Sequence, residues 1–219
     1  MRGCIDARWR CCLAGSFAES VSVGGLSFTS KGSTDIYIAR YGAADGAHRW
    51  SAGEGGSDLD EVLDVAASGS SIAVVGHLNG RVSFGGPFLM AQASDGFVAK
   101  FDAETGGHEL SLLMGGPLDD GAERVAVRAD GQWTISGGFA GTANFGEISL
   151  SGGGHFIVDL DGPTGAVTAV RSVGTIINEV VTSPQSLVVG GYFTSPLTAL
   201  NQTLTPDGDA DGYVLAIKR

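Results

Sequence analysis

The chain has 219 residues, 43% of them hydrophobic, and a mean hydropathy of +0.17. This length and composition fit one soluble domain with a sizeable buried core. Thirteen basic residues against 24 acidic ones give a formal net charge of -11. Because this charge opposes attraction to nucleic-acid phosphates and to anionic lipids, nucleic acid is not an expected partner. An acidic surface does attract cations and basic proteins, although it is more often a device for solubility.

Segment 1–12 is atypical of the rest of the chain. It contains all three cysteines, Cys4, Cys11 and Cys12, an odd number without metal-ligand spacing, so we expect no disulfide framework. The segment lacks the apolar stretch of a signal peptide, and no apolar run anywhere is long enough for a membrane helix. The sequence therefore predicts no membrane insertion and contains no recognisable export signal.

Glycine is abundant, with 36 residues against six prolines, and it recurs in a fixed register. A glycine followed two residues later by an apolar side chain occurs at Gly15-Ser16-Phe17, Gly76-His77-Leu78, Gly137-Gly138-Phe139 and Gly191-Tyr192-Phe193. The first three of these glycines are 61 residues apart, and the fourth follows after 54. A period of this length indicates an array of equivalent units.

A second block repeats in phase with these glycines, at residues 35–41, 95–101, 154–160 and 211–217. Each copy has an aromatic residue at its third position and is apolar on both faces for several residues. Aromatic and β-branched residues favour strands, and apolar character on both faces is typical of a strand between packed layers. We therefore predict four equivalent strands that are buried on both sides.

Glycine turns follow the first three blocks, at Asp45-Gly46, Thr105-Gly106 and Thr164-Gly165, where glycine supplies the positive φ of a hairpin. Each full period holds four short strands and no helical periodicity. This predicts an all-β fold, a β-propeller-like array of about four four-stranded blades. A helical solenoid would need a 3.6-residue pattern, and a β-sandwich would not require this in-register repetition.

These motifs resemble the SBBP family, the seven-bladed β-propeller repeat of bacterial surface and secreted proteins. The resemblance covers residues 13–219. It rests on the Gly-x-Phe strand end, the Phe-Gly-Gly-like turn, the Asp-x-Phe-Val-Ala-Lys-Phe strand, and the Gly-Gly-x-x-x-Asp stretches around residues 56–60 and 116–120. It implies an extracellular or cell-surface location and a binding or structural role, and it carries over no catalytic residues.

The last repeat departs from the pattern, with Ala199 where Phe84 and Phe145 stand in their repeats. A weaker likeness, to the tryptophan-docking repeats of quinoprotein propellers, rests on the spacing from Gly46 to Trp50. That tryptophan occurs in one blade, and the period here is longer.

We divide the chain into the atypical segment 1–12 and four approximate blades at residues 13–56, 57–116, 117–174 and 175–219. Counting from the first repeated glycine gives three, four, four and three strands, short of the sixteen that four closed blades need. We therefore expect a partial or incompletely closed propeller. An open arc would leave apolar faces for self-association or for further blades. A small closed four-bladed ring is the alternative.

The string from Asp207 to Gly212 contains the one candidate metal site, formed by Asp207, Asp209 and Asp211. Alternating aspartates with glycine converge oxygens around a hard cation, so the string resembles the start of a calcium loop. Asp211, however, aligns with Asp35 as the residue that enters the repeated strand. Lys218 stands where an EF-hand would place its bidentate glutamate. Calcium is thus the one cofactor that the sequence suggests, and a structural role for Asp211 is the alternative.

Histidines and further acidic residues have simpler explanations. His48 and His108 occupy equivalent positions, which favours packing beside a turn over metal ligation, whereas His77 and His155 fall at different phases of the repeat. Acidic residues recur near the turns as Asp58, Asp60, Glu61 and Asp64, and then as Asp119, Asp120 and Glu123. Paired carboxylates hydrolyse glycosides, but their repetition favours solvated turns capped by aspartate.

The sequence thus favours a non-enzymatic surface or secreted module that binds protein or polysaccharide or acts as a scaffold. A structural spacer from a larger propeller protein is the first alternative, and a propeller-type hydrolase or lyase is the second. Neither zinc nor nucleotide chemistry has a recognisable motif in this chain.

Overall fold

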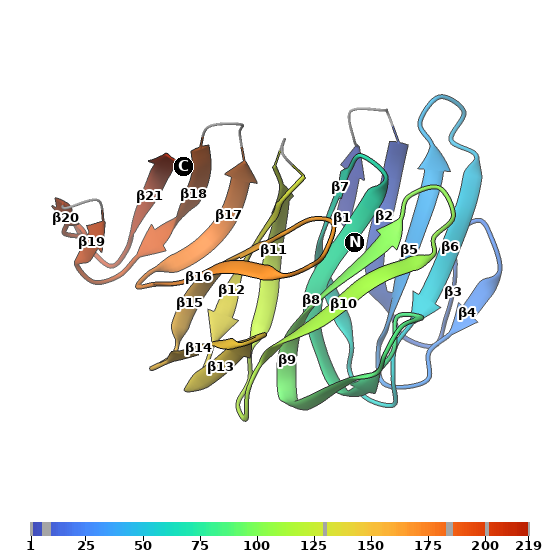
Figure 1. The fold of residues 1–219 in the computed structure, drawn as a ribbon, viewed down its shortest axis with the longest axis horizontal. Helices are drawn as coiled ribbons and strands as arrows, with labels where there is room; N and C mark the ends of the chain where they lie inside the picture. The colour runs from blue at the N-terminus through green and yellow to red at the C-terminus, as the bar shows by residue number, and fades with distance from the viewer. Residues whose placement is uncertain (1, 6–9, 129–130, 183–185, 200–201, 219) are drawn as a thin grey trace.

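The computed structural model describes all residues except 1, 6–9, 129–130, 183–185, 200–201 and 219 (Figure 1). Its described residues form β-strands and no helix, which confirms the all-β prediction. Accordingly, those residues include no helix that is long and apolar enough to cross a membrane.

Four antiparallel meanders follow one another along the chain, and we call them blades 1 to 4. Blade 1 consists of β1 (Arg2–Ile5), β2 (Arg10–Phe17), β5 (Asp35–Gly42) and β6 (His48–Glu54). Blade 2 consists of β7 (Glu61–Ser68), β8 (Ser71–Val82), β9 (Leu89–Asp102) and β10 (His108–Gly115). Blade 3 consists of β11 (Gly121–Val127), β12 (Trp133–Phe139), β15 (Gly154–Leu160) and β16 (Val167–Val173). Blade 4 has the three strands β17 (Ile176–Thr182), β18 (Ser186–Phe193) and β21 (Asp211–Lys218).

Each repeat also contains a second hairpin that the sequence analysis did not predict. It is formed by β3 (Ser20–Ser22) with β4 (Ser27–Thr29), by β13 (Thr142–Phe145) with β14 (Ile148–Ser151), and by β19 (Leu197–Ala199) with β20 (Gln202–Leu204). In blade 2 the long strands β8 and β9 continue into the corresponding hairpin. β13 pairs with β10, so the hairpin of blade 3 extends the sheet of blade 2. The repeated Phe-Gly pair, Phe84-Gly85 and Phe145-Gly146, lies at the tip of this hairpin. Gly85 has the positive φ of 92° that such a turn requires.

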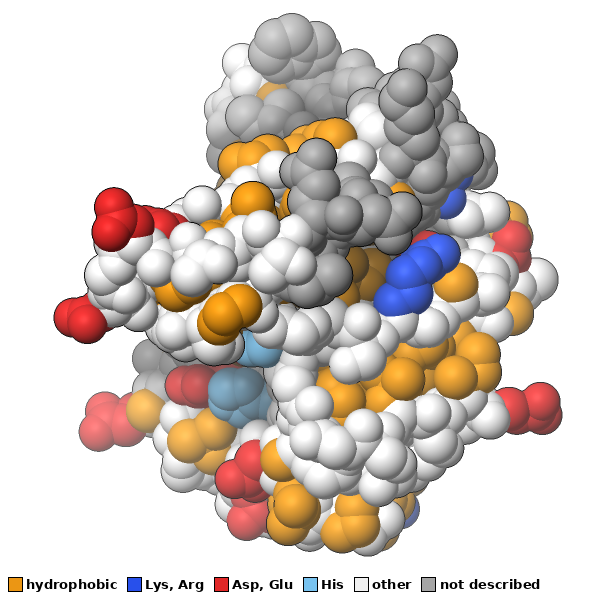
Figure 2. Space-filling model, turned by 90° about the vertical axis from the view of Figure 1, so that its left-hand side faces the viewer, with side chains coloured by type: hydrophobic (Ala, Val, Ile, Leu, Met, Phe, Trp, Pro, Cys, Tyr) orange, Lys and Arg blue, Asp and Glu red, His pale blue; other side chains and the backbone are white. Residues whose placement is uncertain are grey.

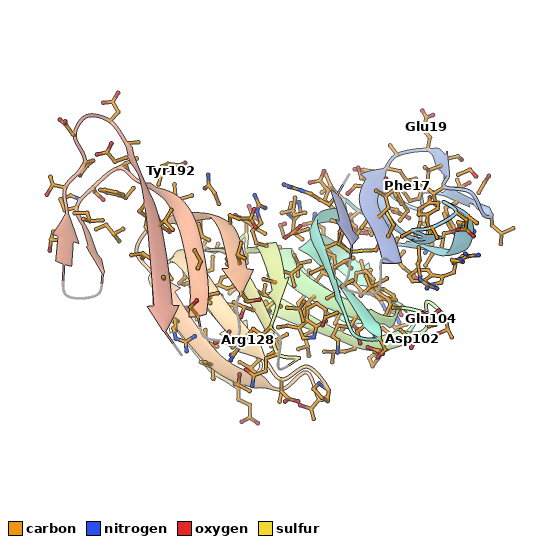
Figure 3. All side chains as sticks on the ribbon, turned by 90° about the horizontal axis from the view of Figure 1, so that it is seen from above. Phe17, Glu19, Asp102, Glu104, Arg128 and Tyr192 are labelled. Atoms are coloured by element: carbon orange, nitrogen blue, oxygen red, sulfur yellow. A yellow bond between two sulfur atoms is a disulfide. The ribbon has the colours of Figure 1, made fainter. Side chains whose placement is uncertain are left out.

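The first strands of the blades, β1, β7, β11 and β17, lie next to one another, as the first strands of propeller blades do. Seen from above, the four sheets follow an arc, and blades 1 and 4 stand at its two ends without meeting (Figure 3). This confirms an incompletely closed propeller-like array, and the closed four-bladed ring is wrong for this chain. The boundaries drawn at residues 56, 116 and 174 fall between consecutive meanders.

The core consists of the apolar layers between adjacent blades. One cluster joins blades 1 and 2, a second joins blades 2 and 3, and a third joins blades 3 and 4. The repeated strand is buried on both faces, as predicted: Phe97, Val98 and Ala99 are all inaccessible to solvent. A blade therefore depends on both neighbours, because each contributes one wall of the layer.

The glycine turns at the outer edge also connect neighbouring blades. Gly46, Gly106 and Gly165 have φ values of 63°, 73° and 69°, which confirms the predicted hairpin turns. A Cβ atom at Gly106 would meet the ring of Trp50 at 2.8 Å, so the turn of blade 2 has room for the tryptophan of blade 1. The Nε1 atom of Trp50 donates to the carbonyl oxygen of Ala103 at 3.0 Å.

Segment 1–12 forms part of blade 1 and is not separate from it. It provides β1, the first strand of that blade, and the beginning of β2. The sequence analysis expected no disulfide framework and missed a single disulfide: Cys4 lies directly opposite Cys12, with 5.2 Å between the Cα atoms, and their sulfur atoms are bonded. An antiparallel hairpin brings together two cysteines eight residues apart, which a count of cysteines does not reveal. Cys11 is a free thiol.

Candidate binding groove between blades 2 and 3

Two of the acidic residues near the blade-connecting turns, Asp60 and Asp120, are buried caps, whereas Asp58 and Asp119 are exposed. Asp60 and Asp120 have exposed fractions of 0% and 5%, so the expectation of solvated turns is wrong for both. Asp120 accepts hydrogen bonds from the backbone amides of Gly116 at 2.7 Å and Ala140 at 2.8 Å. Asp60 accepts in the same way from Gly56 at 2.7 Å and Asn79 at 3.2 Å.

A second buried carboxylate stands beside each of these caps. Asp95 accepts from the amide of Gly116 at 3.1 Å and from that of Gln92 at 3.0 Å, so two carboxylates share one turn. Burial raises the pKa of Asp95 and Asp120 above the usual carboxyl range, although the backbone amides partly lower it. These carboxylates accept hydrogen bonds from backbone amides of the turn. Their repetition is therefore explained by the capping of the same turn in successive blades.

A shallow, open groove of about 550 Å³ lies beside this turn, next to His77 in the middle of β8 and to the start of β15. Its lining consists of His77, Ser94, Asp119, Asp120, Gly121, Glu123, Gly138, Phe139, Ala140, Gly154 and His155. The sequence analysis treated the two histidines as unrelated, because they fall at different phases of the repeat. The antiparallel register explains their meeting: His155 pairs with Gly138, and Gly138 is the blade 3 equivalent of His77.

Four of the lining residues depart from the repeat. Asp119 and Glu123 stand where blade 2 has Leu59 and Leu63, and the position of His77 is Gly138 in blade 3. The position of His155 is Gly96 in blade 2. Repeated residues serve the fold, so residues that break the repeat and meet in one groove mark a candidate site.

The polar groups of the groove remain only partly paired. The Nε2 atom of His77 lies 3.0 Å from a carboxylate oxygen of Glu61, and a carboxylate oxygen of Asp119 accepts from the amide of Ser94 at 3.2 Å. The buried Nδ1 atom of His155 has no hydrogen-bond partner among the described residues. This arrangement suits a ligand that brings positive charge and hydrogen-bond donors.

A smaller pocket of about 250 Å³ lies between blades 3 and 4 and shares Gly154 and His155 with the groove. Its other lining residues include Thr175 and Tyr192. His155 thus stands between two adjacent hollows on the same edge of the array.

His48 and His108 pack beside turns, as predicted. The Nε2 atom of His48 lies 3.1 Å from the Oγ atom of Ser51, and that of His108 lies 3.1 Å from the Oγ atom of Ser111. Each imidazole fills the space above the glycines of the second hairpin, and a Cβ atom at Gly86 would lie 2.2 Å from the ring of His108.

The proposed calcium string occurs in the loop before β21. Asp207 and Asp209 are exposed, and a carboxylate oxygen of Asp211 accepts from the amide of Asp207 at 2.7 Å. Asp211 thus has the strand-entry role that its alignment with Asp35 suggested. Within the described residues, which include all three aspartates, no group of three or more His, Cys, Asp or Glu residues is placed to hold a metal ion. Calcium binding stays a prediction.

No family model and no curated protein matches the chain. Among solved structures, the chain is similar to the Dos1 propeller, with 15% sequence identity and a TM-score of 0.38 over 75% of this chain. The chain spans 39% of that protein's length. The sheet order and the adjacency of the first strands show that this chain is an open array of propeller-like blades.

Proposed function

We propose that the chain is a non-enzymatic β-propeller module of the SBBP type, secreted or at the cell surface, and that it binds a partner in the groove between blades 2 and 3. The observation that carries this proposal is the convergence of four repeat-breaking residues, Asp119, Glu123, His77 and His155, on one groove. A repeat protein places its ligand where the repeat is broken, because the repeated residues already serve the turns and the layers.

The partner that fits this chemistry best is a basic segment of a protein. Three acidic residues, Asp119, Asp120 and Glu123, line the groove with two histidines, and the described lining contains no lysine or arginine. The whole chain has a net charge of -11. Complementary charge accelerates association and selects partners of the opposite sign. A polysaccharide is the other ligand class that the family resemblance suggests.

Fluorescence anisotropy with a labelled oligolysine peptide tests this proposal. We expect binding that weakens with added salt and falls about tenfold in the double variant D119N/E123Q, since about 1.4 kcal/mol corresponds to a factor of ten. The charge-matched control E19Q/E147Q changes two exposed acidic residues outside the groove and should bind like the wild type. Equal binding by both double variants would contradict the groove as the site.

The same protein separates the alternatives. Salt-insensitive retention on a neutral polysaccharide would favour the glycan ligand, and release of reducing ends would favour a hydrolase or lyase. An absence of binding to either ligand class would favour the structural spacer.

A further inference from the structure

The face of blade 4 that points away from blade 3 is apolar and exposed. Ile38, Val98, Ile157 and Val214 occupy the same position of the repeated strand in blades 1 to 4. Their exposed fractions are 0%, 0%, 2% and 75%. The next blade covers the first three, so Val214 marks the wall of a layer whose other wall is absent from the arc.

Other residues on the same side of blade 4 show the same contrast. Val181 is 55% exposed, whereas its blade 3 equivalent Ala126 is buried against blade 4. Tyr192 also lies on this side and is partly exposed. We call Val181, Tyr192 and Val214 the blade-4 face. Figure 2, which looks onto this end of the molecule, shows hydrophobic side chains in several places, with acidic side chains mostly toward the edges and a basic side chain nearer the centre.

The opposite end of the arc has a complementary wall. Leu13 is partly exposed, whereas Val74 at the same position of blade 2 is fully buried against blade 1. Tyr41 is likewise only partly buried, whereas its equivalent Phe101 is 1% exposed. We call Leu13, Cys11 and Tyr41 the blade-1 face. At each junction within the chain, the residues equivalent to the blade-1 face pack against the residues of the preceding blade that are equivalent to the blade-4 face.

Charges on the first strands alternate from blade to blade. Arg2, Asp64, Arg124 and Glu179 all stand opposite the same position of the second strand, namely Ala14, Val75, Ser136 and Gly190. Arg124 lies 4.0 Å from Glu179, and a carboxylate oxygen of Asp64 accepts from the amide of Val125 at 3.1 Å. The series begins with a positive residue on blade 1 and ends with a negative one on blade 4.

We propose that a second copy of this chain docks its blade-1 face on the blade-4 face, head to tail, and so continues the array across the junction. The contact extends the internal repeat, with Val214 packed as Ile157 is packed within the chain. It also continues the charge series, because Glu179 of one copy meets Arg2 of the next. A second copy thus matches both the apolar wall and the sign of the charge.

Sedimentation velocity of the purified chain over a concentration series tests the proposal. We expect the mass of two copies, or of higher multiples if the arcs do not close on each other. Val214→Asp and Leu13→Asp should each raise the dissociation constant at least about tenfold, because a carboxylate would be buried without a partner. Leu118→Asp is the matched control, since Leu118 is 53% exposed at a turn far from both faces.

A mixture of the two blocked variants distinguishes head-to-tail docking from like-face docking. Val214→Asp keeps an intact blade-1 face, and Leu13→Asp keeps an intact blade-4 face. We therefore expect the mixture to form a one-to-one dimer and no larger species. Matched circular dichroism spectra of all variants exclude misfolding as the cause. A wild-type chain that stays monomeric, a V214D chain that associates like the wild type, or a mixture that stays monomeric would each overturn the proposal.

Discussion

The junction between blades 2 and 3 and the junction between blades 3 and 4 share one strand register but contain different side chains. On blade 2, Ala73 and Val75 are buried in the cluster that joins it to blade 3. On blade 3, Thr134 and Ser136 stand at the equivalent positions and point toward blade 4. Thr134 donates to Asp159 at 2.7 Å, whereas the buried Oγ atom of Ser136 has no partner among the described residues.

The turn from blade 3 to blade 4 also lacks the two buried carboxylates that hold the turn from blade 2 to blade 3. Asp95 and Asp120 both hold the turn from blade 2 to blade 3, whereas Gly154 and Thr175 stand at these positions in the turn to blade 4. The hydroxyl of Thr175 donates to the carbonyl oxygen of Tyr192 at 2.8 Å and also interacts with the Tyr213 side chain. The backbone repeat therefore determines where blades meet, whereas the side chains determine how strongly they are held. We therefore expect the junction between blades 3 and 4 to open first under denaturant.

The largest effect should come from the aromatic core of the stronger junction. Phe156 is fully buried and packs edge-on against Phe145, with 4.7 Å between ring centroids. Phe156→Ala should lower the free energy of unfolding by about 3–5 kcal/mol through the cavity that it leaves. Urea titration followed by circular dichroism measures this, and Val214→Ala at the exposed end should stay within about 0.5 kcal/mol of the wild type. Equal effects of the two variants would refute the contrast between the layer and the open end.

A smaller effect should follow from the turn carboxylate. Asp120→Ala leaves two backbone amides without this acceptor and should cost about 1–3 kcal/mol. Thr175→Ala removes a neutral hydroxyl and should cost about 1 kcal/mol, because hydrogen bonds between neutral groups are weaker than those to a carboxylate. The same urea titrations provide both values. A larger cost for the threonine variant would reverse our ranking of the two junctions.

The buried carboxylates also predict a pH dependence. Burial raises the pKa of Asp95 and Asp120 above 3.8, so the native state binds protons more readily than the unfolded chain. Their contribution to stability therefore falls as the pH rises through the folded-state pKa. Relative to D95N/D120N, the wild type should gain melting temperature as the pH is lowered from neutral toward the ordinary carboxyl range. A gain in the opposite direction, seen by scanning fluorimetry, would contradict the sign of these shifts.

Removing the unpaired hydroxyl should strengthen the weaker junction. Ser136→Ala should raise the free energy of unfolding by about 1 kcal/mol, because a buried hydroxyl without a partner is desolvated without compensation. Ser172→Ala, at an exposed position, serves as the control and should change nothing. A loss of stability in the Ser136 variant would mean that this hydroxyl has a partner.

The smallest effect is expected for calcium at the open end. Because the three aspartates are not gathered into a metal-holding group, millimolar calcium should leave the melting temperature unchanged. Asp211→Asn should lower that temperature by weakening the cap on Asp207, and Asp209→Asn should not. A calcium-dependent rise that Asp209→Asn abolishes would instead establish the metal site.

Periodicity in the sequence was sufficient to predict the blades, because each blade must repeat the residues that its turns and layers need. Gly46 and Gly106 predicted hairpin turns, because glycine readily adopts the positive φ that these turns require. The block around Phe97 predicted a strand buried on both faces. The repeated acidic residues were recognised as turn residues. Their burial was not, because a carboxylate near a turn has the same sequence signature whether water or backbone amides surround it.

Tertiary structure decided everything that depends on two distant segments meeting. His77 and His155 share a groove because antiparallel pairing superposes different phases of the repeat, and Cys4 meets Cys12 because a hairpin lies between them. The sequence predicted apolar faces at the ends of an open arc, but the second hairpins and the residues of the blade-4 face were identified only from the structure. A repeat fixes local backbone geometry residue by residue, but whether a side chain is buried or paired depends on atoms that other parts of the chain bring to it.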